Sequence, residues 1–241
     1  MKNHLHLVQF RDPVEKARYV RRMFNRISPR YDLMNRLMTF GQDIRWRKIA
    51  IAKTALPRGG RLLDIACGTG DLARASLVRH PALVCAADFS ERMVALGAKK
   101  HREHGEICFM VADGLSLPFS DSTFDAAVTG FSLRNVVDID RFIGEMTRVV
   151  KPGGKVVLLE ITPFRQPVLS AFMKFYFQKI VPLIGGLIAG DREAYTYLPQ
   201  SVEIFLPAEK LADKMRQLGL VEVGYQLLNF KTVAIHEGTV P

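Results

Sequence analysis

A glycine turn is the first feature of this sequence that could carry chemistry. The apolar run 61–66 leads through Gly68-Thr69-Gly70 into a segment, 72–79, with a helical pattern. Glycines let the backbone approach a ligand closely, and the first turn of a helix offers free N–H groups. The turn therefore predicts a nucleotide-type ligand. The third glycine of the GxGxxG fingerprint is absent, which counts against NAD.

Three acids stand at or near the ends of three successive predicted strands. Asp64 lies within the first strand, Asp88 ends the second, and Asp113 follows the third. The carboxyl ends of parallel strands form the ligand-binding edge of such sheets, where a carboxylate can bind ribose hydroxyls. Any one of these acids could be an ordinary loop or cap residue. Three at one edge suit a ligand with a sulfonium cation and no phosphate, so they predict S-adenosylmethionine as the cofactor.

The elements that must position these residues alternate between strand and helix patterns. The predicted strands are 61–66, 82–87, 107–112, 124–129, 155–161, 221–228 and 232–236, and the predicted helices include 72–79, 90–101, 139–150 and 208–218. Helical patterns also cover 13–56, with a break at Ser28-Pro29. This alternation predicts an α/β fold with a doubly wound, mostly parallel sheet. The tight turn before 232 predicts an antiparallel pair at its end.

The charge distribution and the cysteine content indicate which partners and which cellular compartment to expect. The net charge of +10 is concentrated in residues 1–60, where 14 Lys or Arg stand against 4 Asp or Glu. Such a region can contact an anionic membrane, nucleic acid or an acidic partner, or form a solvated face. The three cysteines form no CxxC pair, so we expect no metal site and a cytoplasmic location. The N-terminus lacks the apolar core of a signal peptide.

The 241 residues predict one domain with four parts. These parts are an N-terminal helical cap (1–56), a cofactor-binding core (57–162), a hydrophobic insertion (163–205) and a C-terminal helix with a strand pair (206–241). The stretch 163–189 is rich in aromatic and aliphatic residues. Two interpretations stay open for it: a lid over a lipophilic substrate channel, or a cap that packs on the core.

Several further motifs resemble those of the ubiquinone/menaquinone biosynthesis C-methyltransferases. They are YDLMN at 31–35 with Trp46, FSLRNV at 131–136, and RVVKPGG at 148–154 with Glu160. The resemblance covers nearly the whole chain. It implies a Rossmann-like class I methyltransferase with seven strands, one of them antiparallel. It also implies methylation of a ring carbon of a polyprenylated quinol, as in the step from demethylmenaquinol to menaquinol or in ubiquinone biosynthesis.

The chain departs from the family pattern at five positions. Thr39 and Thr162 stand where the family has Ser, Ser132 where it has Gly, Gly130 where it has Ser, and Asp43 where it has His. The exchange at Asp43 changes a possible charge and so bears on the choice of substrate.

The turn, the acids and the resemblance together give the expected site. The predicted cofactor-binding residues are Asp64, Gly68, Thr69, Gly70, Asp88, Phe89, Asp113, Gly114 and Gly130. The predicted catalytic residues are Tyr31, Asp32, Arg134 and Asn135.

Methylation of an aromatic ring carbon requires a phenolate. An aromatic carbon is a poor nucleophile until a neighbouring ring hydroxyl ionises, so the site must favour the phenolate and hold the ring in line. Arg134 stays protonated, so we expect it to stabilise the phenolate or orient a water, with Asn135 on the same oxygen. Tyr31 and Asp32 would line the ring pocket. Two structural alternatives remain: Arg134 could pair with Asp138, and Tyr31 could be plain core packing.

The expected partners are the quinol and an anionic membrane contacted by the basic N-terminus and 163–189. A homodimer is left open. No nucleic acid is expected, because GFSLRN at 130–135 lacks the Asn/Asp-Pro-Pro-Tyr/Phe turn of amino-group DNA methyltransferases and no cysteine follows a proline. Two functional alternatives remain: a methyltransferase for another lipophilic phenol, and a non-catalytic cofactor-binding scaffold of a quinone-synthesis assembly.

Overall fold

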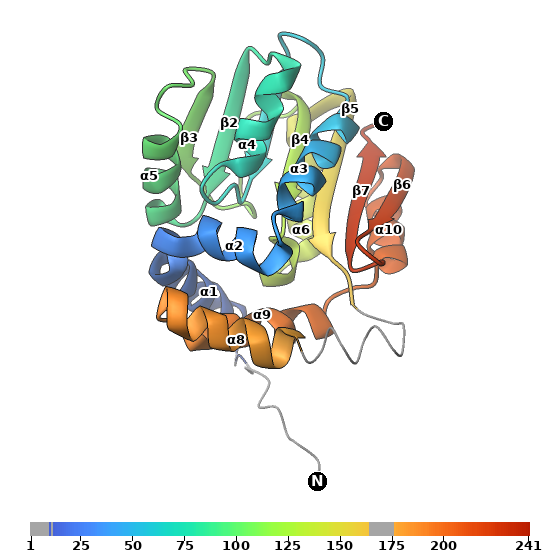
Figure 1. Cartoon of the computed structure of the whole chain (residues 1–241). Helices are drawn as coiled ribbons and strands as arrows, with labels where there is room; N and C mark the ends of the chain where they lie inside the picture. Colours follow the sequence, from blue (N-terminus) through green and yellow to red (C-terminus); the bar gives the residue numbers. More distant parts are fainter. Residues whose placement is uncertain (1–9, 11, 164–175) are drawn as a thin grey trace.

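A computed structural model describes residue 10 and residues 12–163 and 176–241, and its centre is a seven-stranded sheet (Figure 1). The strands are β1 (Arg61–Ile65), β2 (Leu83–Asp88), β3 (Ile107–Val111), β4 (Phe124–Gly130), β5 (Val150–Ile161), β6 (Val221–Leu228) and β7 (Val233–Thr239). Their order is β3-β2-β1-β4-β5-β7-β6, and β7 runs antiparallel to both of its neighbours while the pairs from β3 to β5 are parallel. The expected sheet with one reversed strand is confirmed.

Helices cover both faces of the sheet and its carboxyl edge. They are α1 (Pro13–Ile27), α2 (Tyr31–Thr39), α3 (Gln42–Lys53), α4 (Asp71–Ser76), α5 (Glu91–Lys100), α6 (Ile139–Val149), α8 (Val181–Ile184), α9 (Arg192–Glu203) and α10 (Ala208–Gln217). Short 3-10 turns include Ser28–Arg30, at the predicted break, and Leu133–Asn135. π-helical turns, Tyr176–Ile180 and Gly185–Ala189, flank α8.

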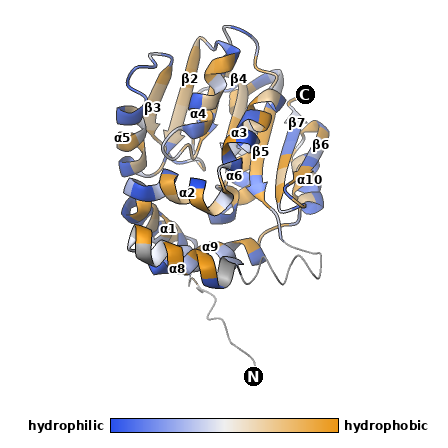
Figure 2. Cartoon of the chain, in the orientation of Figure 1, coloured by the Kyte–Doolittle hydropathy of each residue, from blue (hydrophilic) through white to orange (hydrophobic). Residues whose placement is uncertain are grey.

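Alternate residues of the strands feed two hydrophobic clusters, as a sheet buried on both faces requires. Leu62 and Val157 belong to the cluster under α3 and α4, and Leu63 and Val156 to the cluster under α6 and α10. Figure 2 shows the contrast between the largely hydrophobic strands and the two-sided helices. The hydrophobic pattern from which the strands were predicted therefore arises because both faces of the sheet are buried.

One strand differs from the expectation. We expected the fifth strand to begin at 155, but β5 begins at Val150. Val150 pairs with Phe124 of β4, and the register then shifts before Ala126 pairs with Lys155. Residues 151–154 are thus an irregularity inside a longer strand, with Gly153 in the left-handed region at φ 79°.

The carboxyl edge of the sheet is covered by α1, α2, α8 and α9, which lie together beneath the strand ends (Figure 1). They share a hydrophobic cluster that includes Val20, Met34, Val181 and Tyr195. The described part of the insertion thus packs against the N-terminal helices, whereas residues 164–175 lie outside the described residues. Helix α3, expected in the same cap, packs on the sheet face instead. Within the described ranges no helix is long and apolar enough to cross a membrane.

Candidate active site

A cavity of about 510 Å³ lies at the carboxyl ends of β1 to β4, between these strands and α1. We call it the cofactor cavity. Six of the predicted cofactor residues line it: Gly68, Asp88, Phe89, Asp113, Gly114 and Gly130. Helix α1 closes it with Ala17, Arg18, Val20, Arg21 and Phe24. No spacing pattern in the sequence predicted a part for α1, because its contact with the cavity depends on how the helix crosses the sheet edge.

The glycine turn owes its shape to left-handed backbone. Ala66, Gly68 and Gly70 have φ angles of 54°, 57° and 84°. The N–H of Gly68 donates to the Asp88 carboxylate at 2.9 Å. A side chain on Gly70 would collide with the ring of Phe109, so glycine is required there both for its positive φ angle and for lack of space. Of the three residues of the turn, Gly68 lines the cofactor cavity, whereas Thr69 and Gly70 do not, and their contact with a cofactor stays a prediction.

Asp88 is the buried acid that faces the cofactor cavity. Besides Gly68, the N–H of Ser90 donates to it at 2.8 Å, and the Ser90 hydroxyl caps α5 by accepting from the Met93 N–H at 3.2 Å. Burial nevertheless raises the pKa of Asp88 to about 6. Once ionised, its carboxylate can accept hydrogen bonds from ribose hydroxyls.

Asp64 lies behind the cavity lining rather than in it. The side chain is fully buried, and Oδ2 accepts a hydrogen bond from the Ala73 N–H at 2.9 Å. Burial raises the pKa of this carboxyl to about 8. The position ties β1 to the first turn of α4, and its contact with a cofactor stays a prediction.

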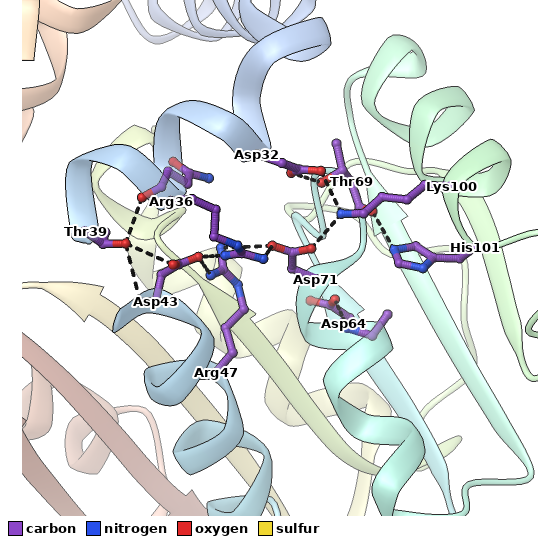
Figure 3. Close-up of polar contacts among 12 residues, drawn as sticks. Asp32, Arg36, Thr39, Asp43, Arg47, Asp64, Thr69, Asp71, Lys100 and His101 are labelled. Atoms are coloured by element: carbon purple, nitrogen blue, oxygen red, sulfur yellow. Dashed lines mark hydrogen bonds and ion pairs between the residues drawn. The ribbon is translucent and has the colours of Figure 1, made fainter. Parts of the chain in front are cut away.

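Thr69 and Asp32 contact each other. The Thr69 hydroxyl donates to Asp32 Oδ1 at 2.5 Å, and Lys100 binds both Asp32 and Asp71 at 2.7 Å. Figure 3 shows this network continuing to Arg36, which lies 2.8 Å from Asp71. The predicted roles of Thr69 and Asp32 toward cofactor and substrate stay predictions. These hydrogen bonds and ion pairs hold α2 over the glycine turn.

A second cavity, of about 360 Å³, lies between the cap helices and the ends of β5 and β7. We call it the cap cavity. Its lining is mainly apolar, and the charged members among the described residues are Asp43, Arg47 and Arg134. Phe24, Tyr31, Phe131 and Asn135 line both cavities. The two cavities therefore meet at these four side chains.

Arg134 stands in the cap cavity with a partner that the sequence did not reveal. Its Nη1 donates to Glu160 Oε1 at 2.6 Å and to the Phe131 carbonyl at 2.7 Å. The alternative pairing with Asp138 is wrong, because that carboxylate caps α6 by accepting from the Arg141 N–H at 2.9 Å. Glu160 was visible only as part of a motif; spacing along the chain gives no sign of a contact between neighbouring strands.

Tyr31 also does more than pack. It begins α2 and contacts Phe24 edge-on at 6.0 Å between ring centroids, yet it lines both cavities. Burial raises the pKa of its phenol, against the opposing effect of Arg47 and Arg134. Both cations therefore act on the junction of the two cavities.

Asp43, which stands where the family has His, lies in a network of ion pairs. Its carboxylate, 1% exposed, forms ion pairs with Arg36 and Arg47 and accepts a hydrogen bond from the Thr39 hydroxyl at 2.9 Å (Figure 3). Arg47, which we did not predict, lies one helical turn after Asp43, a spacing that could have suggested the pair. An acid is therefore matched here by two buried or half-buried arginines.

The family model of the ubiE/COQ5 methyltransferases matches residues 13–240. The chain belongs to the ubiE/COQ5 methyltransferase family. It is 46% identical to the demethylmenaquinone methyltransferase of Roseiflexus sp. (strain RS-1), over 94% of this chain and 95% of that one. It is 43% identical to the ubiquinone/menaquinone biosynthesis C-methyltransferase UbiE of Desulfotalea psychrophila, over 93% and 92%.

Solved structures are similar to this ubiE/COQ5 family member in fold. The cyclase SpnF superposes with a TM-score of 0.70 at 20% identity, over 93% of this chain and 96% of that one. A SAM-dependent methyltransferase from Thermotoga maritima gives a TM-score of 0.63 at 20% identity, over 91% and 99%. A cyclase on the same frame shows that reaction type is set by the site rather than by the fold.

As a ubiE/COQ5 family member, the protein is an S-adenosylmethionine-dependent C-methyltransferase. The cofactor cavity fits that ligand by its chemistry. Its acids, Asp88 and Asp113, suit ribose and adenine donors, and its volume is within the range of ligand pockets. The Asp113 carboxylate also fixes its own loop by accepting from the Leu115 N–H at 2.9 Å.

Proposed function

We propose that this protein methylates a ring carbon of a polyprenylated quinol in menaquinone or ubiquinone biosynthesis. The observation that carries the proposal is the meeting of two unlike cavities at Tyr31, Phe131 and Asn135. One cavity has acids at strand ends, and the other is an aromatic and aliphatic chamber with few charges. Such a junction allows an apolar ring carbon to be presented to a methyl donor.

The residues of the cap cavity suit phenolate chemistry. S-adenosylmethionine, when bound, supplies an electrophilic methyl group. The Arg134 guanidinium, fixed by Glu160 and 8% exposed, offers a permanent positive charge to a ring oxygen. The Asn135 side chain, also buried, can hydrogen-bond the oxygen next to the reacting carbon. The aromatic walls around them exclude water and hold the ring in line.

The names of the relatives support both a naphthoquinol and a benzoquinol. The test is to express the chain in a bacterial strain that lacks its own quinone C-methyltransferase and to identify the quinones by mass spectrometry. We expect a methylated quinone with the native chain and none with Arg134→Ala. Arg216→Ala, a change in an exposed pair with Asp213, is the matched control and should complement. Unmethylated precursor alone would favour another phenol or a scaffold.

A membrane contact at the mouth of the cap cavity belongs to the same proposal. Phe40 and Phe230 are 80% and 78% exposed, and both line that cavity. Both also have left-handed backbone, at φ 52° and 54°, which turns an aromatic ring outward at the end of α2 and between β6 and β7. Exposed aromatics at a cavity mouth suit insertion between lipids, and the basic residues of 1–60 suit an anionic surface. A homodimer stays a prediction.

A further inference from the structure

Unpartnered polar atoms lie on three of the residues that line the cap cavity. Among the described residues, the buried side-chain atoms without a hydrogen-bond partner include Arg134 Nε, Asn135 Oδ1 and the Tyr195 hydroxyl, and all three residues line this cavity. Buried polar groups in proteins nearly always have a partner, so each such atom needs an explanation. Arg134 and Asn135 already have a place in the proposed chemistry, whereas Tyr195 has none.

Tyr195 is held firmly in position. It lies in α9, is 3% exposed, and belongs to the cluster formed with α1 and α2. Its ring lies against Gly185, where any side chain would collide with it. Burial raises the pKa of its hydroxyl well above the ordinary range, so the group keeps its proton and can donate a hydrogen bond. A hydroxyl that is fixed in place and has no acceptor within the described residues can donate its hydrogen bond to an oxygen of a bound ligand.

We propose that the Tyr195 hydroxyl hydrogen-bonds the second ring oxygen of the quinol, the one that is not next to the methylated carbon. The inference rests on the proposed quinol substrate. The reacting carbon and its neighbouring oxygen must lie where the cavities meet, beside Asn135, which lines both. Tyr195 lines the cap cavity and not the cofactor cavity. The two oxygens of a hydroquinone lie on opposite sides of the ring, so the second one lies away from the junction, in the part of the cap cavity to which the proposal assigns Tyr195.

The consequence is a specificity-determining residue. A site built to hydrogen-bond a substrate hydroxyl discriminates against an analogue that lacks it, because the site's own polar group is then left unpaired. Tyr195 would thus favour hydroquinones over phenols with a single ring oxygen.

The test compares two acceptors under reducing, oxygen-free conditions: 3-prenyl-1,4-naphthalenediol and 3-prenyl-1-naphthol, which lacks the second oxygen. Tyr195→Phe removes one oxygen atom and keeps the ring against Gly185. The matched control is Tyr197→Phe, in the same helix and cavity lining and 6% exposed, because its hydroxyl is not among the unpartnered buried atoms. The quantity measured is the ratio of kcat/KM for the two acceptors, with thermal unfolding as a check on folding.

We expect Tyr195→Phe to lower kcat/KM for the diol by about 10- to 100-fold and to leave the naphthol nearly unchanged. Tyr197→Phe should keep the wild-type ratio. An equal loss on both acceptors, or no loss on either, would overturn the role of Tyr195. Wild-type protein that methylates neither acceptor would overturn the proposed function and this inference with it, so the two failures are distinguishable.

Discussion

The Arg134 guanidinium and the Glu160 carboxylate lie 2.6 Å apart, although 26 residues separate them along the chain. Arg134 follows β4 and Glu160 lies near the end of β5, and these strands are neighbours in the sheet. Both side chains are almost completely buried, at 8% and 2% exposed. The strand pairing therefore fixes the one cation that the proposed chemistry places beside the ring.

Glu160→Gln should lower kcat while cofactor affinity stays unchanged. Glutamine keeps a hydrogen-bond acceptor but removes the charge that holds Arg134, so the guanidinium is less well placed, and we expect a loss of about 10- to 100-fold. Cofactor affinity should hold because Glu160 does not line the cofactor cavity. The control is Glu237→Gln, a change in a pair with Lys53 outside both linings. Equal kcat in both variants would contradict a positioning role for Glu160.

Cofactor affinity should depend on pH through Asp88. With a pKa of about 6, its carboxyl is mostly protonated at pH 5 and mostly ionised at pH 7.5. Only the ionised group accepts from both ribose hydroxyls, so S-adenosylhomocysteine should bind about tenfold more weakly at pH 5. Calorimetry at the two pH values measures this. Asp88→Asn should bind weakly at both, and a flat wild-type profile would argue against a direct contact.

Asp43→His should destabilise the fold rather than restore a family feature. A neutral or cationic imidazole cannot compensate Arg36 and Arg47, and removal of one partner of a buried pair costs about 3–5 kcal/mol. Urea unfolding gives the free energy. Asp213→His, in an exposed pair with Arg216, is the control and should change it by less than about 1 kcal/mol. If both variants matched the wild type, the buried network would carry no net stability.

The stabilising effect of Asp64 should decrease as pH rises. Its folded pKa of about 8 lies above the ordinary 3.8, so between about pH 4 and pH 8 the folded state holds a proton that the unfolded state has lost. Stability from this group is complete below the unfolded pKa and is lost as pH rises through the folded one. Asp64→Asn removes this dependence, so wild type should lose free energy of unfolding relative to Asp64→Asn from pH 4 to pH 8. A constant difference between them would show that Asp64 ionises normally.

Membrane binding should depend on the two exposed aromatics at the cavity mouth. We expect the double variant Phe40→Ser, Phe230→Ser to lose flotation with vesicles of anionic phospholipid at low salt, because an apolar anchor is removed from the surface. Ile204→Ser, at a residue 72% exposed and outside the cavity lining, is the control and should float like the wild type. Flotation of the double variant at the wild-type level would place the contact elsewhere.

The amino-acid sequence by itself determined the fold and the sheet edge at which the cofactor cavity lies. Strand and helix periods, the glycine turn and the acids Asp88 and Asp113 are local signals, and parallel strands bring their carboxyl ends to one edge whatever the detailed packing. That is why the sequence could place Asp88 and Asp113 together, and both line one cavity.

Only the tertiary structure decided which side chains meet across that edge. Arg134 contacts Glu160 and Thr69 contacts Asp32, although each pair lies far apart in the chain. Tyr195 likewise lines the cap cavity beside residues of distant elements. Such contacts leave no period or spacing in the sequence, because they depend on strand order and on the angle at which α2 and α9 cross the sheet edge. The sequence pattern could therefore indicate the chemistry of the cofactor. The cap cavity, in which we propose that the acceptor ring binds, forms only when the cap helices pack on the sheet edge.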